Sequence, residues 1–175
     1  MLFRQAVLVV LVSFAAVQLA DGLVQCPYPS PLRTFSGSNF VGAPVQAHES
    51  FVPSLEKINQ YAKESKVKVY VIQSFRRVGR RVTGSVIPPS HRINHFAGHA
   101  IDINVAYCGI LCNSRCLQSR PLPERVQTFL DKIRADSDLR WGGDMNPPHP
   151  TQFDDGLSVN DRETWEQHFE DVQMC

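Results

Sequence analysis

Apolar and polar positions alternate strictly along one short segment of the chain: Ile101, Asp102, Ile103, Asn104 and Val105. A period of two is typical of a strand with one buried face, so Asp102 is predicted to lie on the face opposite the apolar side chains. His95 lies in the loop that comes before this strand. Gly98 follows it, and a glycine lets such a loop turn back sharply. A loop histidine and a strand carboxylate are therefore expected to converge on one point.

The remaining elements follow from the same kind of pattern. Apolar residues recur at helical spacing in three segments, which are predicted to be helices: residues 50–65, 123–136 and 161–170. Alternating valines predict a strand over 67–71, and short strands or turns are expected at 139–143 and 153–157. Together these elements predict an α+β fold: a small antiparallel sheet with packed helices, and a cleft at the His95–Asp102 edge.

The first residues are typical of a secretory signal peptide. Arg4 gives a positive start, and the apolar run of residues 6–19 is too short to span a bilayer as a helix. No later segment is long and apolar enough to cross a membrane. We therefore expect a secreted, extracellular protein without a membrane partner after cleavage. The predicted division is a signal peptide at 1–22, an extended N-terminal arm at 23–49 and one domain at 50–175.

Five cysteines follow the predicted signal peptide: Cys26, Cys108, Cys112, Cys116 and Cys175. In an oxidising compartment most of them should pair, and at least two of the three in the segment 108–116 are expected to have disulfide partners. Metal binding by this segment is the weaker interpretation, because zinc sites favour two-residue gaps and a second ligand pair. Since five is odd, one cysteine is left free or joins two chains as a disulfide-linked dimer.

The charge pattern bears on partners. The formal net charge is +1, so nothing in it favours binding to nucleic acid or to an anionic membrane surface. A local basic patch comes from five arginines: Arg76, Arg77, Arg80, Arg81 and Arg92. The patch is either a solvated loop or a rim that attracts an anionic ligand, such as a peptide carboxylate or an acidic polymer.

The pair His95 and Asp102 carries the candidate chemistry. A neutral imidazole and a carboxylate are ordinary zinc ligands. The alternative is a buried His–Asp hydrogen bond that fixes a turn. The other histidines are expected to be ordinary surface residues: His48 and His91 in loops, and His99 facing solvent or the surroundings of the site.

Three ordered motifs resemble the zinc D-alanyl-D-alanine carboxypeptidases, a superfamily that also holds L-alanyl-D-glutamate endopeptidases and the hedgehog signalling domain. Residues 95–102, His-Phe-Ala-Gly-His-Ala-Ile-Asp, match the family signature His-x-x-Gly-x-Ala-x-Asp. Residues 73–76, Gln-Ser-Phe-Arg, are similar to Ser-Gly-Tyr-Arg, and residues 141–144 read Trp-Gly-Gly-Asp as in the family. The resemblance implies a hedgehog-like or DD-peptidase-like α+β fold, one zinc ion and action on short or D-centred peptides.

The family site holds zinc with a histidine, an aspartate and a second histidine, and a carboxylate three residues before that second histidine acts as base. His95 and Asp102 match the first two ligands. In the preferred alignment His149 falls on the base and Gln152 on the third ligand. Another register makes His149 the ligand, and a third register uses His168. No register supplies both a third ligand and a carboxylate base.

The resemblance therefore implies His95, Asp102 and His149 as candidate metal ligands for zinc. Arg76 matches the family arginine that steadies substrate charge, and it is the candidate catalytic residue. Two functions stay open. One is a secreted zinc metallopeptidase-like protein with degenerate activity. The other is a non-catalytic extracellular matrix or ligand-binding protein on the same fold, whose partner is a peptide or another extracellular ligand with an anionic group.

Overall fold

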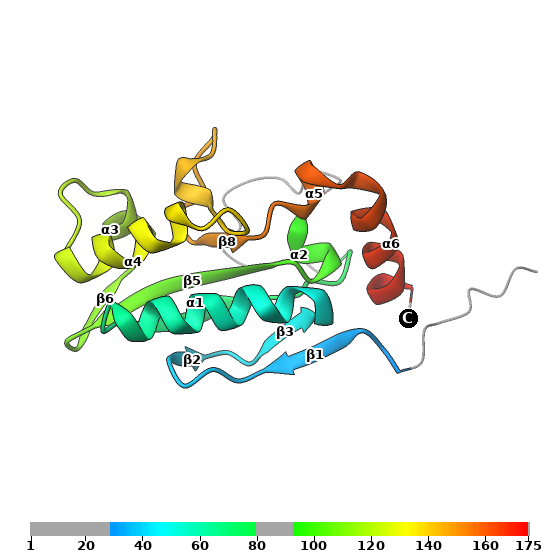
Figure 1. The fold of residues 1–175 in the computed structure, drawn as a ribbon, viewed down its shortest axis with the longest axis horizontal. Helices are drawn as coiled ribbons and strands as arrows, with labels where there is room; N and C mark the ends of the chain where they lie inside the picture. Colours follow the sequence, from blue (N-terminus) through cyan, green and yellow to red (C-terminus); the bar gives the residue numbers. More distant parts are fainter. Residues whose placement is uncertain (1–28, 80–92, 175) are drawn as a thin grey trace, which may run out of the picture.

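The computed structural model describes residues 29–79 and 93–174. The predicted signal peptide, Cys26, Cys175 and His91 lie outside these ranges, as do the basic-patch residues Arg80, Arg81 and Arg92. The described chain is an α+β fold, as the sequence predicts: a mixed sheet carries helices on one face, and a further group of helices lies at one end (Figure 1).

A six-stranded sheet forms the centre of the described molecule, with the long strand β5 in its middle. Its strands are β2 (Phe40–Gly42), β4 (Lys68–Gln73), β5 (Ala100–Tyr107), β6 (Ile110–Cys112), β7 (Arg140–Trp141) and β8 (Gln152–Asp154). The order is β2-β4-β5-β8-β7, and β6 pairs with the far end of β5. All pairs are antiparallel except β2 with β4. The alternation along β5 is confirmed, because Ile101, Ile103 and Val105 are buried whereas Asp102 is only half-buried.

Two of the predicted helices cover the sheet. The helices are η1 (Glu49–Phe51), α1 (Val52–Glu64), α2 (Asn94–Ala97), α3 (Ser114–Gln118), α4 (Glu124–Ala135), η2 (Gly142–Asp144), α5 (Leu157–Asn160) and α6 (Arg162–Gln173). Helices α1 and α4 bury their apolar stripes in the main core, where Phe129 and Phe153 are fully enclosed. Helix α6 lies at one end of the molecule beside α2 (Figure 1). In the described ranges no helix has the length and apolarity needed to cross a membrane.

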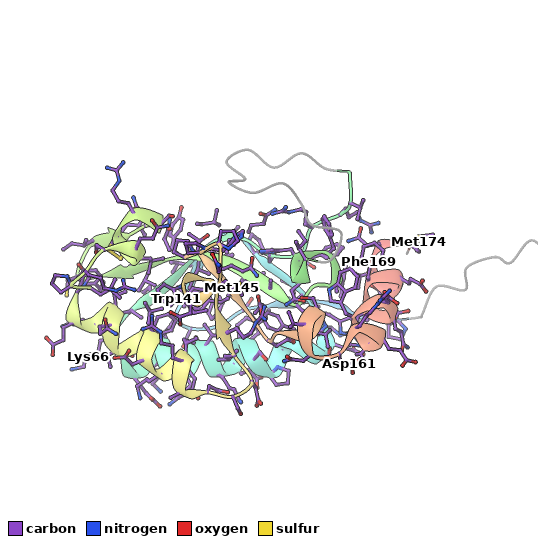
Figure 2. The ribbon with its side chains drawn as sticks, turned by 90° about the horizontal axis from the view of Figure 1, so that it is seen from above. Lys66, Trp141, Met145, Asp161, Phe169 and Met174 are labelled. Carbon is purple, nitrogen blue, oxygen red and sulfur yellow. A yellow bond between two sulfur atoms is a disulfide. The ribbon has the colours of Figure 1, made fainter. Side chains whose placement is uncertain are left out.

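A second, smaller cluster holds α6 against α2. Trp165 is buried with Phe96 and Ala97, and Phe169 packs beside them. Asp161 caps the start of α6 by accepting from the backbone N–H of Thr164. Figure 2 shows Asp161, just before α6, and Phe169 on α6 at one end of the molecule, with Trp141 nearer its middle. The helix predicted over 161–170 is thus confirmed, and its apolar face is buried through Trp165.

Some local predictions needed correction. The predicted loop that carries His95 is the short helix α2, which ends because Gly98 adopts a left-handed conformation with φ 78°. Within the predicted N-terminal arm, two strands form an antiparallel pair, β1 (Leu32–Phe35) with β3 (Val45–His48), while β2 joins the main sheet. The arm lacks a clear period in the sequence because each strand is only three or four residues long.

One disulfide joins Cys112 and Cys116. The expectation that at least two cysteines of the segment 108–116 have disulfide partners is therefore confirmed. Cys108 is exposed, forms no disulfide with a described residue, and accepts a hydrogen bond from Arg125.

A polar contact locks α1 to the end of α4. Tyr61 donates to Asp136 Oδ2 at 2.8 Å, and Lys57 Nζ lies 3.1 Å from Asp136 Oδ1. Burial alone would raise the pKa of Asp136, but the hydrogen bonds from the backbone of Asp138 and from Tyr61 and Lys57 lower it overall. The carboxylate therefore stays charged in the folded protein and links the two helices.

This contact predicts a pH-dependent effect of Asp136→Asn. The folded pKa of Asp136 lies below its ordinary value of 3.8, so its contribution is present above that pH and is lost as the pH falls through the folded pKa. Denaturant unfolding at pH 7 should show Asp136→Asn less stable than wild type by about 1–2 kcal/mol. The difference should shrink toward zero as the pH falls through the folded pKa of Asp136. A difference that does not change on acidification would contradict this account.

Candidate functional site

The structure brings His95 and Asp102 together at the end of β5. Helix α2 ends at Gly98, whose N–H returns to the carbonyls of Asn94 and His95, and this turn folds His95 back over the start of the strand. The imidazole Nε2 lies 3.3 Å from Asp102 Oδ2. The proximity expected from the sequence pattern is therefore observed, whereas the role of this pair as metal ligands stays a prediction.

The tautomer of His95 follows from its second contact. Its Nδ1 lies 2.8 Å from the carbonyl oxygen of Ser74, and because a carbonyl only accepts, Nδ1 carries a proton. A neutral ring then presents the Nε2 lone pair to the carboxylate of Asp102. Two facing acceptors need a cation between them, which is either a second proton on the ring or a metal ion. A backbone carbonyl on the distal nitrogen is also the usual support of a metal-binding histidine.

Asp102 is held in its charged form. Burial alone would raise its pKa, but the contacts with His95, the hydrogen bond from Thr151 and the charge of Arg76 lower the pKa overall. The Thr151 hydroxyl donates to Oδ1 at 3.1 Å, so Oδ2 is the oxygen that faces His95. An ionised carboxylate with one oxygen already satisfied suits the binding of a single cation.

Arg76 follows the end of β4 and adjoins this pair. Its backbone N–H donates to the carbonyl of His95 at 3.0 Å, and its Nη2 donates to Gln73 Oε1 at 2.7 Å. Its Nε is buried and has no hydrogen-bond partner among the described residues. Burial lowers the pKa of Arg76, while the charge of Asp102 raises it. Because the Arg76 side chain is partly exposed, its remaining N–H groups can bind an anionic ligand.

The register of the sheet identifies the residue opposite Asp102. Strand β8 pairs with β5 so that Gln152 lies directly across from Asp102, and paired residues of adjacent strands share one face of a sheet. The preferred alignment gives Gln152 the position of the third ligand. Its amide Nε2, however, donates to Asp154 Oδ2 at 2.6 Å, so the amide is already bound to a residue of the same strand.

His149 lies in the loop between η2 and β8. Its backbone N–H donates to Gly142 and its carbonyl accepts from Gln152, so the loop conformation is fixed by the backbone. In the described part of the chain, His149 does not join His95 and Asp102 in a set of three closely spaced ligand atoms. The described residues thus offer two strong donors here, fewer than the three protein ligands of a catalytic zinc site, and they do not complete one.

A different histidine cluster is the one that the described residues complete. One ring nitrogen from each of His48, His99 and His168 lies within 4.8 Å of the other two, so this set could hold a metal ion. His48 and His99 are 5% and 1% exposed. This corrects the expectation that His48 is a surface loop residue, and of the two alternatives for His99 it excludes the one facing solvent. His168, one of the three alternative ligands, lies here. Nothing in the local sequence marks these three residues, because they are 51 and 69 positions apart.

Hydrogen bonds fix the ring of His99 within this cluster. Its Nδ1 lies 2.6 Å from Asp155 Oδ2, and its Nε2 lies 2.9 Å from His168 Nδ1 and 3.2 Å from Ser50 Oγ. His48 stacks on His168 with ring centroids 3.8 Å apart. Its Nδ1 accepts from the backbone N–H of Ser50 and contacts the Ser50 hydroxyl at 2.7 Å. The cluster is therefore a connected network with one carboxylate at its edge.

Two histidines of the cluster, His48 and His168, have lowered pKa values. Burial, together with the neighbouring charges of His168, His99 and Arg33, lowers the pKa of His48 to about 3. Burial and His99 also lower the pKa of His168, against the raising effects of Asp171, Asp155 and Asp161. At neutral pH the rings of His48 and His168 are therefore uncharged, and a neutral imidazole is the form that binds metal ions.

Comparisons with known proteins give little beyond the fold. No family model matches the chain, and no curated protein matches it. Among solved structures, it is similar to the L-Ala D-Glu endopeptidase ChiX of Serratia marcescens, with 18% identity and a TM-score of 0.43, over 64% of this chain and 82% of that chain. A likeness of this size carries no conclusion about activity, so the residues themselves have to carry the functional argument.

Proposed function

We propose that this chain is a secreted metallopeptidase-like protein that binds short peptides through a free carboxylate and has lost efficient cleavage. The observation that carries the proposal is Gln152, which lies opposite Asp102 where the family resemblance implies a second ligand histidine. An amide oxygen is a poor zinc donor, and the Gln152 amide is already bound to Asp154. The same alignment gives the base position to His149 in place of a carboxylate.

Arg76 is the residue to which we assign the carboxylate of the ligand. Its guanidinium is partly exposed and lies near the charge of Asp102, and a guanidinium binds carboxylates through parallel N–H donors. Asp102 and His95 lie beside it and would accept from the N–H groups of the same peptide. This charge arrangement supports binding of a peptide carboxylate, and the groups that we propose are missing are those needed for hydrolysis.

A slow zinc metallopeptidase is the second candidate, and one observation favours it. The distance of 3.3 Å between His95 Nε2 and Asp102 Oδ2, with the other ring nitrogen held by Ser74, suits a shared zinc ion. In that case the resemblance gives His149 the role of third ligand or base, and Arg76 the role of stabilising charge on the substrate.

A peptide-binding experiment separates the two candidates. Calorimetric titration of the full chain with a peptide that ends in a free D-glutamate carboxylate should show binding without cleavage. Arg76→Met should weaken it by about tenfold or more, the usual cost of losing a charge-assisted hydrogen bond. The matched control is Arg77→Met, because Arg77 turns toward the carbonyl of Gln173 and should leave the affinity unchanged. Equal losses in both variants would contradict the proposed site, and chelator-sensitive cleavage by wild type would support the enzyme.

Restoring the family residues tests the alignment directly. Gln152→His should let the chain bind one zinc ion more than wild type, because the new imidazole lies opposite Asp102. Combining it with His149→Asp should add measurable peptide cleavage, since a general base typically contributes about 10²–10⁴-fold. Mass spectrometry of the metal-loaded protein counts the ions. If neither variant gains an ion, the position opposite Asp102 is not the third ligand and the alignment is wrong.

A further inference from the structure

Three histidines from distant parts of the chain meet at the end of the molecule where α6 packs. His48 is the last residue of β3, His99 lies between α2 and β5, and His168 is on α6. We propose that these three histidines bind a divalent transition-metal ion, zinc in the first place, at a site separate from His95 and Asp102, and that this ion fastens α6 to the body of the fold.

The donor set is typical of such a site. Imidazole nitrogens suit zinc, copper and nickel, and three histidines with one open position are a known zinc arrangement. One nitrogen of each ring lies within 4.8 Å of the others. In a tetrahedral zinc site ligand nitrogens stand about 3.3 Å apart, as Zn–N distances of about 2.0–2.1 Å require. The side chains therefore need to rotate, without a rebuilt backbone, for the rings to share an ion.

Asp155 prepares His99 for this role. The carboxylate oxygen lies 2.6 Å from Nδ1, so the ring proton is on Nδ1 and the lone pair of Nε2 points into the cluster. A carboxylate on the distal nitrogen is a frequent support of metal-binding histidines, because it fixes the tautomer and raises the basicity of the ligand. His168 Nδ1 lies 2.9 Å from His99 Nε2. A metal ion would replace the proton that these two nitrogens share.

The stacking of His48 on His168 sets a condition for binding. Their planes are 18° apart and their centroids 3.8 Å, whereas a metal ion lies in the plane of each ring that binds it. One of the two rings must therefore turn. His168 is the ring suited to do so, because it is only half-buried.

Binding at His168 would reach the peptide site through α6. Gln173, at the end of the same helix, donates to the carbonyls of Arg76 and Phe96 at 2.7 Å each. Phe96 belongs to α2, the helix that positions His95. An ion that fastens α6 thus also steadies the elements that carry Arg76 and His95.

The experiment is a zinc titration of the full chain after chelator treatment and dialysis. The test variant is His168→Phe, which keeps an aromatic ring to stack on His48 and removes the ligand nitrogens. The matched control is His95→Gln, which alters the other candidate site. We expect wild type and His95→Gln to bind one zinc ion and to gain thermal stability from it. In His168→Phe the affinity for zinc should fall by about 100-fold or more, and zinc should not raise the thermal stability. In Asp155→Asn the affinity for zinc should fall by about 10–100-fold.

Three outcomes would overturn the proposal. Zinc binding that is unchanged in His168→Phe removes this helix from the site. Binding that disappears in His95→Gln and persists in His168→Phe assigns the ion to His95 and Asp102. A wild type that takes up no zinc excludes both sites. Asp155→Asn covers the case in which His168→Phe folds poorly, because it leaves all three rings in place. Peptide binding by wild type without added zinc tests the peptide proposal independently.

Discussion

Replacing Gly98 with alanine is expected to destabilise the protein by about 2–5 kcal/mol, through left-handed strain of about 1–2 kcal/mol and overpacking of about 1–3 kcal/mol. Gly98 has φ +78°, and a Cβ there would meet the backbone nitrogen of His48 at 2.6 Å. That nitrogen donates to the Gly98 carbonyl at 3.0 Å, so the two backbones cannot separate without losing a hydrogen bond. The midpoint temperature of thermal unfolding should fall by about 10 °C in a chain of this size.

Gly109→Ala is the matched control for this prediction. Gly109 has nearly the same φ of +77°, but nothing lies within 4 Å of the Cβ that would be added. It should therefore show only the left-handed strain, about 1–2 kcal/mol. Equal losses in the two variants would mean that the close approach of residues 98 and 48 adds nothing. The backbone shift forced by a side chain at residue 98 would also displace His95 and His99, which lie on either side of it.

Asp154→Ala is expected to cost about 3–5 kcal/mol, because it removes the centre of a buried polar network. Asp154 is fully buried, and Arg140 binds its carboxylate at 2.8 Å through Nε. The same carboxylate accepts from the amide of Gln152 and from the backbone N–H of Gly156. The substitution leaves the charge of Arg140 and the N–H donors of Gln152 and Gly156 without their carboxylate partner, and each unsatisfied buried polar group destabilises the folded state. Denaturant unfolding monitored by circular dichroism measures the loss.

Asp144→Ala provides the comparison that isolates burial. Asp144 also pairs with an arginine through two hydrogen bonds, from Arg134 at 2.8 and 2.9 Å, but its side chain is 49% exposed. An exposed pair of the same geometry should be worth about 0–1 kcal/mol. If both aspartates gave similar losses, burial of Asp154 would not be the cause, and the network around β8 would be less important than we infer.

The sequence by itself determined the elements that have a long or strict period. The alternation around Asp102 predicted β5, and helical spacing predicted α1, α4 and α6, because a side chain's face follows directly from its position along a strand or helix. The turn at Gly98 and the meeting of His95 with Asp102 also followed, since both residues belong to one local segment. The family resemblance placed Gln152 at a ligand position, and the register of β8 with β5 sets it opposite Asp102.

Only the tertiary structure decided the rest. The strands β1, β2 and β3 are too short to show a period, and pairing with partners elsewhere in the chain makes them strands. His48, His99 and His168 look like unrelated polar residues in the sequence, yet the packing of α6 on α2 brings them together. Their burial, and the lowered pKa values of His48 and His168, come from neighbours that are distant along the chain. A local pattern determines which face a residue occupies, but long-range packing determines what lies across from it, and the chemistry of the histidine cluster depends on the latter.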